Sequence, residues 1–293
     1  MTNSLKVLLS EIIDYAGLFP PSQVTMATAV SNFDRYLKSE HAWMLGRFIV
    51  PVSRLDEFSY EAETFLDGKN PWRLSVLATD DLQETLDLVA EFNLEYEGRA
   101  KIDTIEIKVE KAAEINEAAK ILPRELTAYF EIPPNDILAD FITALAITRK
   151  GAKLRTGGVT TDAFPSTDAI IKFMRVCVAA NVPFKATAGL HHPIRGTKPL
   201  TYEPNAPIGT MHGFFNLFLS ACFLRQDLNN LFVHRIMNEN ESENIQFEED
   251  RISWMDQNLS MLTVTLTRQK NAISFGSCSF LEPIEDLQGI GLL

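Results

Sequence analysis

The feature that most constrains the fold of this chain is a regular alternation of short apolar segments with longer segments of helical character. Seven such pairs occupy roughly 190 residues, the spacing that parallel strands joined by helical crossovers require. An eighth apolar segment, 272–280, follows later, and eight strands alternating with helices predict a (β/α)8 barrel. The other predicted strands begin at Ile12, Leu45, Trp72, Ile102, Leu126, Ala152 and Phe184.

The helical segments have recognisable starts, because polar residues that can cap a helix stand before several of them. Asn135 or Asp136 is the expected cap of segment 137–148, and Ser166, Thr167 and Asp168 are expected to cap segment 166–180. An open doubly wound sheet is the other α/β arrangement, but no G-x-G-x-x-G follows the first strand. The pattern therefore favours the closed barrel.

The length of 293 residues suits one barrel, so we expect a single domain, 1–293. The alternation breaks between the seventh and eighth strands, which predicts an insertion over about 191–271. Segments 212–224 and 229–237 have helical character, whereas 262–266 alternates like a strand. We expect the insertion to be mostly helical.

Composition narrows the classes of partner. The formal net charge is −12, which disfavours nucleic acid and membrane surfaces as partners. Three cysteines without metal-type spacing and an N-terminal segment without a targeting pattern predict a cytoplasmic protein. No apolar run reaches the ~18 residues of a membrane span. The apolar segment 214–219 suits the core or a subunit interface, so a homo-oligomer is compatible with the sequence.

Two lysines stand within predicted strands, where apolar residues are the rule. Lys153 and Lys185 lie on successive strands, and each strand runs into a Thr/Ala/Gly turn. If both side chains enter one cavity, each charge lowers the pKa of the other amine, and an amine with a lowered pKa is a nucleophile near neutral pH. The alternative is that they pair with inward carboxylates such as Asp103, Glu106 or Glu131.

The strand ends resemble those of a known family, the deoxyribose-phosphate aldolases. K-L-R-T-G at 153–157 is similar to the family's K-T-S-T-G, and K-A-T-A-G at 185–189 is similar to its K-A-S-G-G. Fragments 13–20, 101–107, 129–132 and 275–279 resemble the family in the same order along the chain. A-G-L-H-H-P at 188–193 indicates a divergent relative.

The resemblance implies a class I aldolase-like lyase on a (β/α)8 barrel that needs no metal or organic cofactor. Lys153 would form a Schiff base with the substrate carbonyl, Lys185 would lower the pKa of Lys153, and Asp103 would assist proton transfer. The substrate would be a small anionic carbonyl compound, phosphorylated or carboxylated.

Arg155 departs from the family pattern, since a small hydroxyl residue is usual there. Its guanidinium shares a strand face with Lys153 and could bind a carboxylate or phosphate bidentately. By the resemblance, backbone N–H groups after the last two strands would bind phosphate. The remaining candidates for substrate binding are Asp14, Glu131, Thr156, Gly157, Thr187, Gly189, His191, His192, Gly276, Ser277 and Ser279.

Two other functions fit the sequence. His191 and His192, with His212, could serve a metal-assisted hydrolase or lyase, although a zinc site needs three or four convergent ligands. Alternatively, the lysines could be structural, and the chain would be a catalytically inactive barrel that acts as a binding protein.

Overall fold

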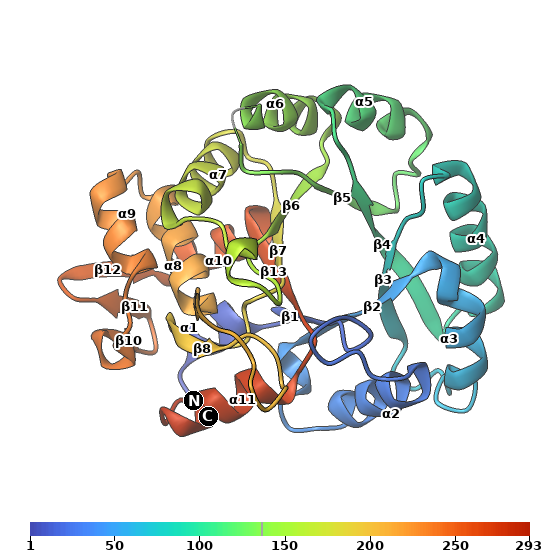
Figure 1. The fold of residues 1–293 in the computed structure, drawn as a ribbon, viewed down its shortest axis with the longest axis horizontal. Coiled ribbons are helices and arrows are strands. Elements are labelled where there is room, and N and C mark those ends of the chain that lie inside the picture. The colour runs from blue at the N-terminus through green and yellow to red at the C-terminus, as the bar shows by residue number, and fades with distance from the viewer. Residues whose placement is uncertain (136) are drawn as a thin grey trace.

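The computed structural model describes residues 1–135 and 137–293. Asp136, one of the two residues offered as a helix cap, lies outside the described residues. Within them, eight parallel strands close into a barrel in the order β1-β13-β7-β6-β5-β4-β3-β2 (Figure 1), which confirms the predicted fold. The barrel strands are β1 Ile13–Tyr15, β2 Leu45–Pro51, β3 Trp72–Leu77, β4 Ala100–Lys108, β5 Thr127–Glu131, β6 Gly151–Arg155, β7 Phe184–Thr187 and β13 Ala272–Ser277.

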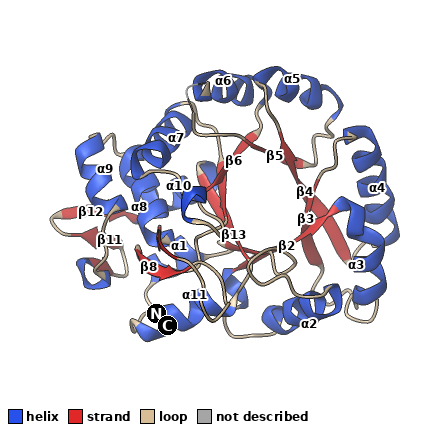
Figure 2. Cartoon of the chain, viewed as in Figure 1, coloured by secondary structure: helices blue, strands red, loops and turns tan. Residues whose placement is uncertain are grey.

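Helices surround the strands on the outside of the barrel (Figure 2). The expected cap of the helix after β6 is confirmed, because the Ser166 side chain accepts a hydrogen bond from the Ala169 N–H. The helices around the barrel are α2 Met26–Leu37, α3 Leu55–Ala62, α4 Leu82–Glu95, α5 Ala112–Ile121, α6 Leu138–Thr148, α7 Thr167–Ala179, α8 Phe214–Arg225 and α11 Leu281–Gly289. None of the helices in the described part of the chain has both the length and the apolar character to span a membrane.

The segment between β7 and β13 is mixed rather than mostly helical. It does contain α8, α9 Asn230–Met237 and α10 Met261–Lys270, and α10 packs against α1 Asn3–Leu9. It also forms a hairpin, β8 Gly196–Pro199 with β9 Ile208–Met211, and a three-stranded antiparallel sheet. The strands of that sheet are β10 Ile245–Phe247, β11 Arg251–Trp254 and β12 Gln257–Ser260.

The strand-like alternation at 262–266 was misleading, since this stretch lies in α10. The helix begins at Met261 and is capped by Ser260, whose side chain accepts a hydrogen bond from the Thr263 N–H. The real strand β11 is short and alternates around only two apolar residues, Ile252 and Trp254, which are buried. Four residues of alternation give little basis for a prediction.

Alternation along β6 and β7 explains how lysines reach the barrel interior. Ala152 and Leu154 belong to the apolar core, and Lys153 between them points the opposite way, into the barrel. On β7, Phe184 and Ala186 likewise belong to the apolar core, and Lys185 between them points into the barrel. The two strands pair in parallel with Lys153 opposite Lys185, so the fold places the two amines beside each other.

Candidate active site

The two lysines share one carboxylate. Lys153 Nζ lies 2.8 Å from Glu106 Oε2, and Lys185 Nζ lies 2.6 Å from Glu106 Oε1. Glu106 comes from β4, across the barrel interior from β6 and β7. The expectation that the lysines meet in one cavity is thus only partly met, because an anion lies between them.

Each lysine also has a second carboxylate. Lys153 Nζ is 2.8 Å from Glu131 Oε2, and Lys185 Nζ is 2.8 Å from Asp14 Oδ2. The result is a continuous row of alternating charges from Glu131 through Glu106 to Asp14. Hydroxyl donors complete it: the Ser75 hydroxyl donates to Glu106 Oε1 and the Ser274 hydroxyl to Asp14 Oδ2.

Ion pairing sets the protonation state of this row. Burial by itself lowers the pKa of Lys153, but the adjacent Glu106 and Glu131 carboxylates outweigh it and the pKa is raised. Burial likewise lowers the pKa of Lys185, but the adjacent Asp14 and Glu106 carboxylates outweigh it and the pKa is raised. Burial raises the pKa of Glu106, yet the two ammonium groups hold it far below its usual range. Both lysines are therefore protonated in the free protein.

The expected net lowering of the Lys153 pKa is accordingly wrong, because Glu106 and Glu131 raise it. The repulsion between the two ammonium groups acts across Glu106, whose charge compensates both. The structure realises the arrangement given as the alternative, in which inward carboxylates pair with the lysines. The two lysines differ in their access to the carboxyl-terminal end of the barrel.

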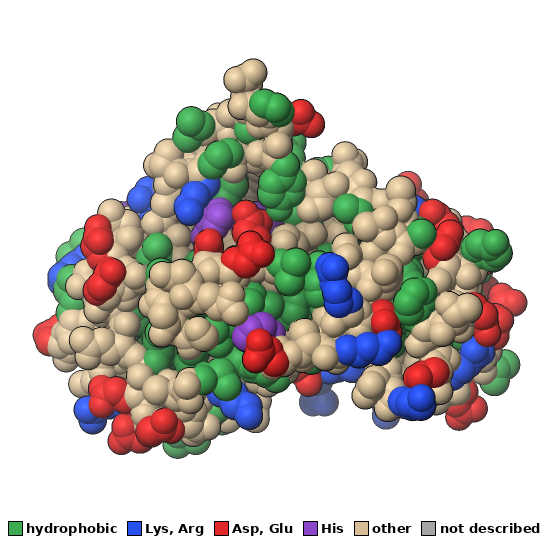
Figure 3. Space-filling model, turned by 90° about the horizontal axis from the view of Figure 1, so that it is seen from below, with side chains coloured by type: hydrophobic (Ala, Val, Ile, Leu, Met, Phe, Trp, Pro, Cys, Tyr) green, Lys and Arg blue, Asp and Glu red, His purple; other side chains and the backbone are tan. Residues whose placement is uncertain are grey.

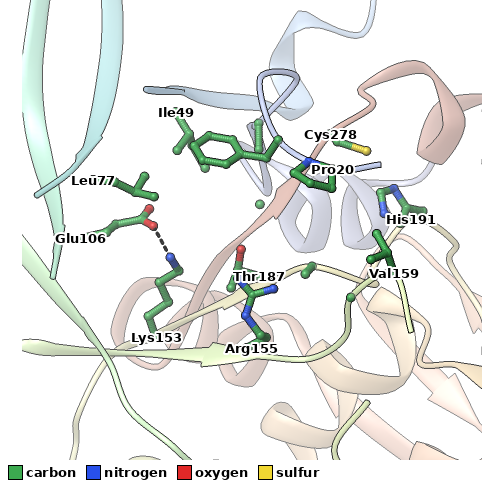
Figure 4. Close-up of a pocket in the computed structure, with 15 residues that line it drawn as sticks. Pro20, Ile49, Leu77, Glu106, Lys153, Arg155, Val159, Thr187, His191 and Cys278 are labelled. Carbon is green, nitrogen blue, oxygen red and sulfur yellow. Dashed lines mark ion pairs between the residues drawn. The ribbon is translucent and has the colours of Figure 1, made fainter. Parts of the chain in front are cut away.

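Lys153 lines a cavity of about 220 Å³ at the carboxyl ends of the strands, where (β/α)8 enzymes have their active sites (Figure 4). Its side chain is 8% exposed, whereas that of Lys185 is 2% exposed and lies outside this cavity. Other lining side chains are Glu106, Arg155, Thr187, His191 and Cys278. Lys153 is thus the lysine that a ligand in the cavity would touch.

Asp103 lies elsewhere in the barrel, which corrects its predicted place beside Lys153. Arg47 Nε is 2.5 Å from Asp103 Oδ1, and Arg73 Nε is 3.0 Å from Asp103 Oδ2. Both arginines border a separate hollow that also includes Glu11, near the amino-terminal ends of the strands. Glu106, three residues further along β4, occupies the position expected for Asp103.

A register shift in β4 explains the error. Successive residues of a regular strand point to opposite faces, so residues three apart should face different ways. The pairing of β3 with β4 shifts between Ile102 and Thr104, which leaves Asp103 without a partner residue on β3. With this irregularity both Asp103 and Glu106 face the barrel interior, and counting along the sequence cannot reveal it.

Replacing Asp103 by asparagine tests this placement. We expect Asp103→Asn to lower the free energy of unfolding by about 2–3 kcal/mol, since two arginines lose a charged partner. The arginines hold the pKa of Asp103 below its ordinary value of 3.8 against the opposing effect of burial, so this stability difference shrinks as the pH falls below 3.8 towards the folded pKa. Urea denaturation at pH 7 and pH 3 measures it. Loss of chemistry at Lys153 in a folded Asp103→Asn protein would contradict the placement.

Several predicted binding residues have packing roles. The Thr156 hydroxyl donates to Ala188 O at 2.6 Å and so ties the end of β6 to the end of β7. A Cβ on Gly157 would lie 2.9 Å from the Gly189 Cα and 2.6 Å from the Phe164 ring. Gly189 has a φ of +72°, which a glycine adopts without strain. Thr156, Gly157 and Gly189 are all described by the structure, and they do not line the cavity of Lys153.

The residues at the end of β13 and just after it have two roles. Gly276 lines the cavity next to Thr187, which lies on the neighbouring strand β7. The Ser277 hydroxyl donates to Ser279 O at 2.7 Å, and the Ser279 hydroxyl accepts from the Glu282 N–H at the start of α11. These two serines order the turn into the last helix. No anion nest is needed to explain them.

The three histidines do not converge. His191 Nδ1 is 3.3 Å from Glu282 Oε2, His192 Nδ1 is 2.6 Å from Asp286 Oδ2, and His212 Nε2 is 3.1 Å from Pro165 O. Within residues 1–135 and 137–293, no group of three or more His, Cys, Asp or Glu side chains is placed to hold a metal ion. The geometry therefore gives the metal-assisted alternative no support. Of the three, only His191 lines the cavity of Lys153.

Sequence reasoning assigned Glu106 only a structural part and did not single out Glu282. Glu106 has a detectable signal, a charged residue in the apolar strand I-D-T-I-E-I. Glu282 has none, because it lies in the first turn of the last helix and meets His191 only through the fold. No protein-family model matches this chain, and no curated protein is found to be similar to it.

Proposed function

We propose that this protein is a class I aldolase-like lyase that acts on a small anionic carbonyl compound through an imine on Lys153. The observation that supports this most directly is the position of Lys153 Nζ at a cavity wall, 2.8 Å from each of two carboxylates. A lysine with only a structural role does not need access to a cavity. Lys185, which is paired just as well, has none.

The carboxylates supply the proton acceptor that imine formation requires. Only the neutral amine attacks a carbonyl, so the ammonium proton of Lys153 must first leave. Glu131 suits this role because its carboxylate contacts only Lys153 of the two lysines, whereas both ammonium groups hold Glu106 in its ionised form. Attack then gives a carbinolamine, and loss of water gives the protonated imine.

Lys185 has a supporting role in this scheme. Its charge stays fixed between Asp14 and Glu106, and it keeps Glu106 ionised while Lys153 changes charge. The protonated imine replaces the ammonium group as the cation next to Glu106, so the row of charges survives the reaction. The imine withdraws electrons, and a carbon–carbon bond next to it can break or form.

Arg155 binds the anionic group of the substrate in this scheme. Its side chain is 57% exposed, lines the cavity, and lies 3.7 Å from Glu131 Oε1, too far for a tight ion pair. A guanidinium that is this loosely held can bind a carboxylate or a phosphate. It stands two residues from Lys153 on the same strand face, which limits the substrate to a small molecule.

We expect Arg155→Gln to raise KM for an anionic substrate by about 10-fold, because a charged hydrogen bond at a half-exposed site contributes about 1.5 kcal/mol. The change in kcat is expected to be smaller. Arg124→Gln, a change of the same kind at an exposed residue outside the cavity, is the control and should leave KM unaltered. Equal KM values for Arg155→Gln and Arg124→Gln would show that Arg155 does not bind the anion.

Borohydride reduction tests the proposed function. The protein is incubated with 4-hydroxy-2-oxopentanoate, a carboxylate, or with 2-deoxyribose 5-phosphate, a phosphate, and then reduced. We expect a covalent adduct that is absent from Lys153→Leu, and the more reactive of the two probes identifies the preferred anion. A folded protein that gives no adduct with either compound would contradict the proposed function.

A further inference from the structure

A second hollow lies at the amino-terminal ends of the barrel strands, at the opposite end of the barrel from the Lys153 cavity. Its volume is about 530 Å³, compared with about 220 Å³ for the Lys153 cavity. Arg47 from β2, Arg73 from β3 and Arg268 from α10 all line it, and we call it the arginine hollow. Guanidinium groups repel one another, so three of them around one space need an explanation.

The positive charge of the arginine hollow exceeds the negative charge beside it. Asp103 pairs with Arg47 and Arg73, and Glu11 Oε2 lies 2.6 Å from Arg73 Nη1. Two arginines thus suffice to compensate these two carboxylates, and Arg268 is a third cation. On the face shown in Figure 3, by contrast, basic side chains are scattered among acidic ones. The excess of arginine is a local feature of a chain whose formal net charge is −12.

Arg268 is held by the main chain and not by an acid. Among the described residues no carboxylate contacts its guanidinium, which donates to the carbonyl oxygens of Leu8, Ser10, Ala272 and Ile273. Burial lowers the pKa of Arg268 to about 10, so the group is still a cation at neutral pH. A desolvated cation is normally compensated by an opposite charge. Arg268 therefore favours the binding of an anion, and its bonds to the main chain fix it in place beforehand.

The other two arginines also have donors to spare. Arg47 uses Nε and Nη2 in its pair with a carboxylate, and Arg73 uses Nε and Nη1. In the part of the chain that the structure describes, no acceptor is found for Arg47 Nη1 or Arg73 Nη2. Thr265 and Gln269 of α10 line the same hollow and add a hydroxyl and an amide donor.

We propose that the arginine hollow binds the phosphate group of a small phosphate monoester through Arg47, Arg73 and Arg268. The donors come from three separate elements, which suits a phosphate with three acceptor oxygens better than a planar carboxylate with two. The volume leaves room for the organic part of the ester beside the phosphate. This site does not share a lining residue with the Lys153 cavity and does not depend on the proposed function.

Isothermal titration calorimetry tests the site with inorganic phosphate and ethyl phosphate as probes. The measurements use Arg155→Gln as the reference protein, because Arg155 in the Lys153 cavity is itself proposed to bind an anion. We expect one phosphate per chain with a Kd of about 1 mM or lower at low ionic strength. Ethyl phosphate should bind at least as tightly. Much weaker binding of ethyl phosphate than of inorganic phosphate would overturn the assignment of a monoester.

Two substitutions in the reference protein should change the affinity in opposite directions. Arg73→Gln removes a charged donor and should weaken phosphate binding about 10-fold. Glu11→Gln removes the negative charge beside Arg73 and releases Arg73 Nη1, so it should tighten binding about 3-fold. Arg124→Gln, at an exposed position outside the hollow, should leave the Kd unaltered.

The tighter binding expected for Glu11→Gln keeps the test decisive if Arg73→Gln is poorly folded, because loss of structure does not increase affinity. Equal Kd values for Glu11→Gln and the reference protein would overturn the site. The same conclusion would follow if the folded reference protein bound no phosphate at about 10 mM and low ionic strength. Neither result concerns the imine on Lys153, whose adduct is measured separately.

Discussion

Lys153→Leu is expected to reduce carbonyl cleavage by about 10⁴-fold or more, since removal of a nucleophile abolishes the covalent route. In the proposed mechanism the amine of Lys153 forms the imine, and the only other lysine in the row is enclosed by Asp14 and Glu106 away from the cavity. The neighbouring groups cannot replace it, because carboxylates and guanidinium do not form imines with carbonyl compounds. Steady-state cleavage of the two β-hydroxy carbonyl probes measures the effect.

Lys153→Arg is the matched control for this change. Leucine leaves Glu106 and Glu131 without one of their cations, so the leucine variant loses stability as well as chemistry. Arginine keeps the charge beside both carboxylates but is not a nucleophile at any pH at which the protein is folded. We expect Lys153→Arg to melt close to the parent protein and to be as inactive as Lys153→Leu. Activity in a well-folded Lys153→Arg protein would exclude an imine on Lys153.

Glu106→Gln is expected to cause the largest loss of stability of the substitutions considered. Glu106 is buried and compensates two buried ammonium groups at 2.6 Å and 2.8 Å. Breaking a buried ion pair costs about 3–5 kcal/mol, so the melting temperature should fall by roughly 10 °C. Without this carboxylate, the two lysines repel each other directly and one ammonium group loses its proton more readily.

The pH dependence of that loss has a definite sign. The pKa of Glu106 in the folded protein lies below its ordinary value of 4.5, so its carboxylate stabilises the fold above that pH. The stabilisation is lost as the pH falls below 4.5 towards the folded pKa. The parent protein and Glu106→Gln should therefore differ most near pH 7 and converge in acid. Glu125→Gln, at an exposed position, should match the parent at every pH; a constant difference for Glu106→Gln would contradict an ion-pair origin.

The barrel was predictable because each repeating unit has a local signature. Apolar neighbours such as Ala152 and Leu154 face the helices, and this period-2 pattern recurs strand after strand. The sheet at 245–260 was not predictable, since its strands have three or four residues each. Strands of that length become stable only through pairing with one another, which no local pattern records.

The candidate site was predictable to the extent that charged residues are rare in buried strands. Lys153 and Lys185 stood out for that reason, and the barrel brings them together. The position of Asp103 along the barrel axis could not be inferred, because the register shift in β4 changes which residue reaches Lys153. The contact of His191 with Glu282 depends on how α11 packs at the end of the chain, and sequence spacing does not encode it.

Peptide mapping after borohydride reduction tests the central claim most directly, because the two lysines provide an internal comparison. Lys153 and Lys185 are paired opposite each other, each with two carboxylates, and differ mainly in access to the cavity. With 4-hydroxy-2-oxopentanoate or 2-deoxyribose 5-phosphate, the account predicts one reduced adduct per chain, on the peptide that contains Lys153. An adduct on Lys185, an even distribution over surface lysines, or none in the folded protein would contradict it.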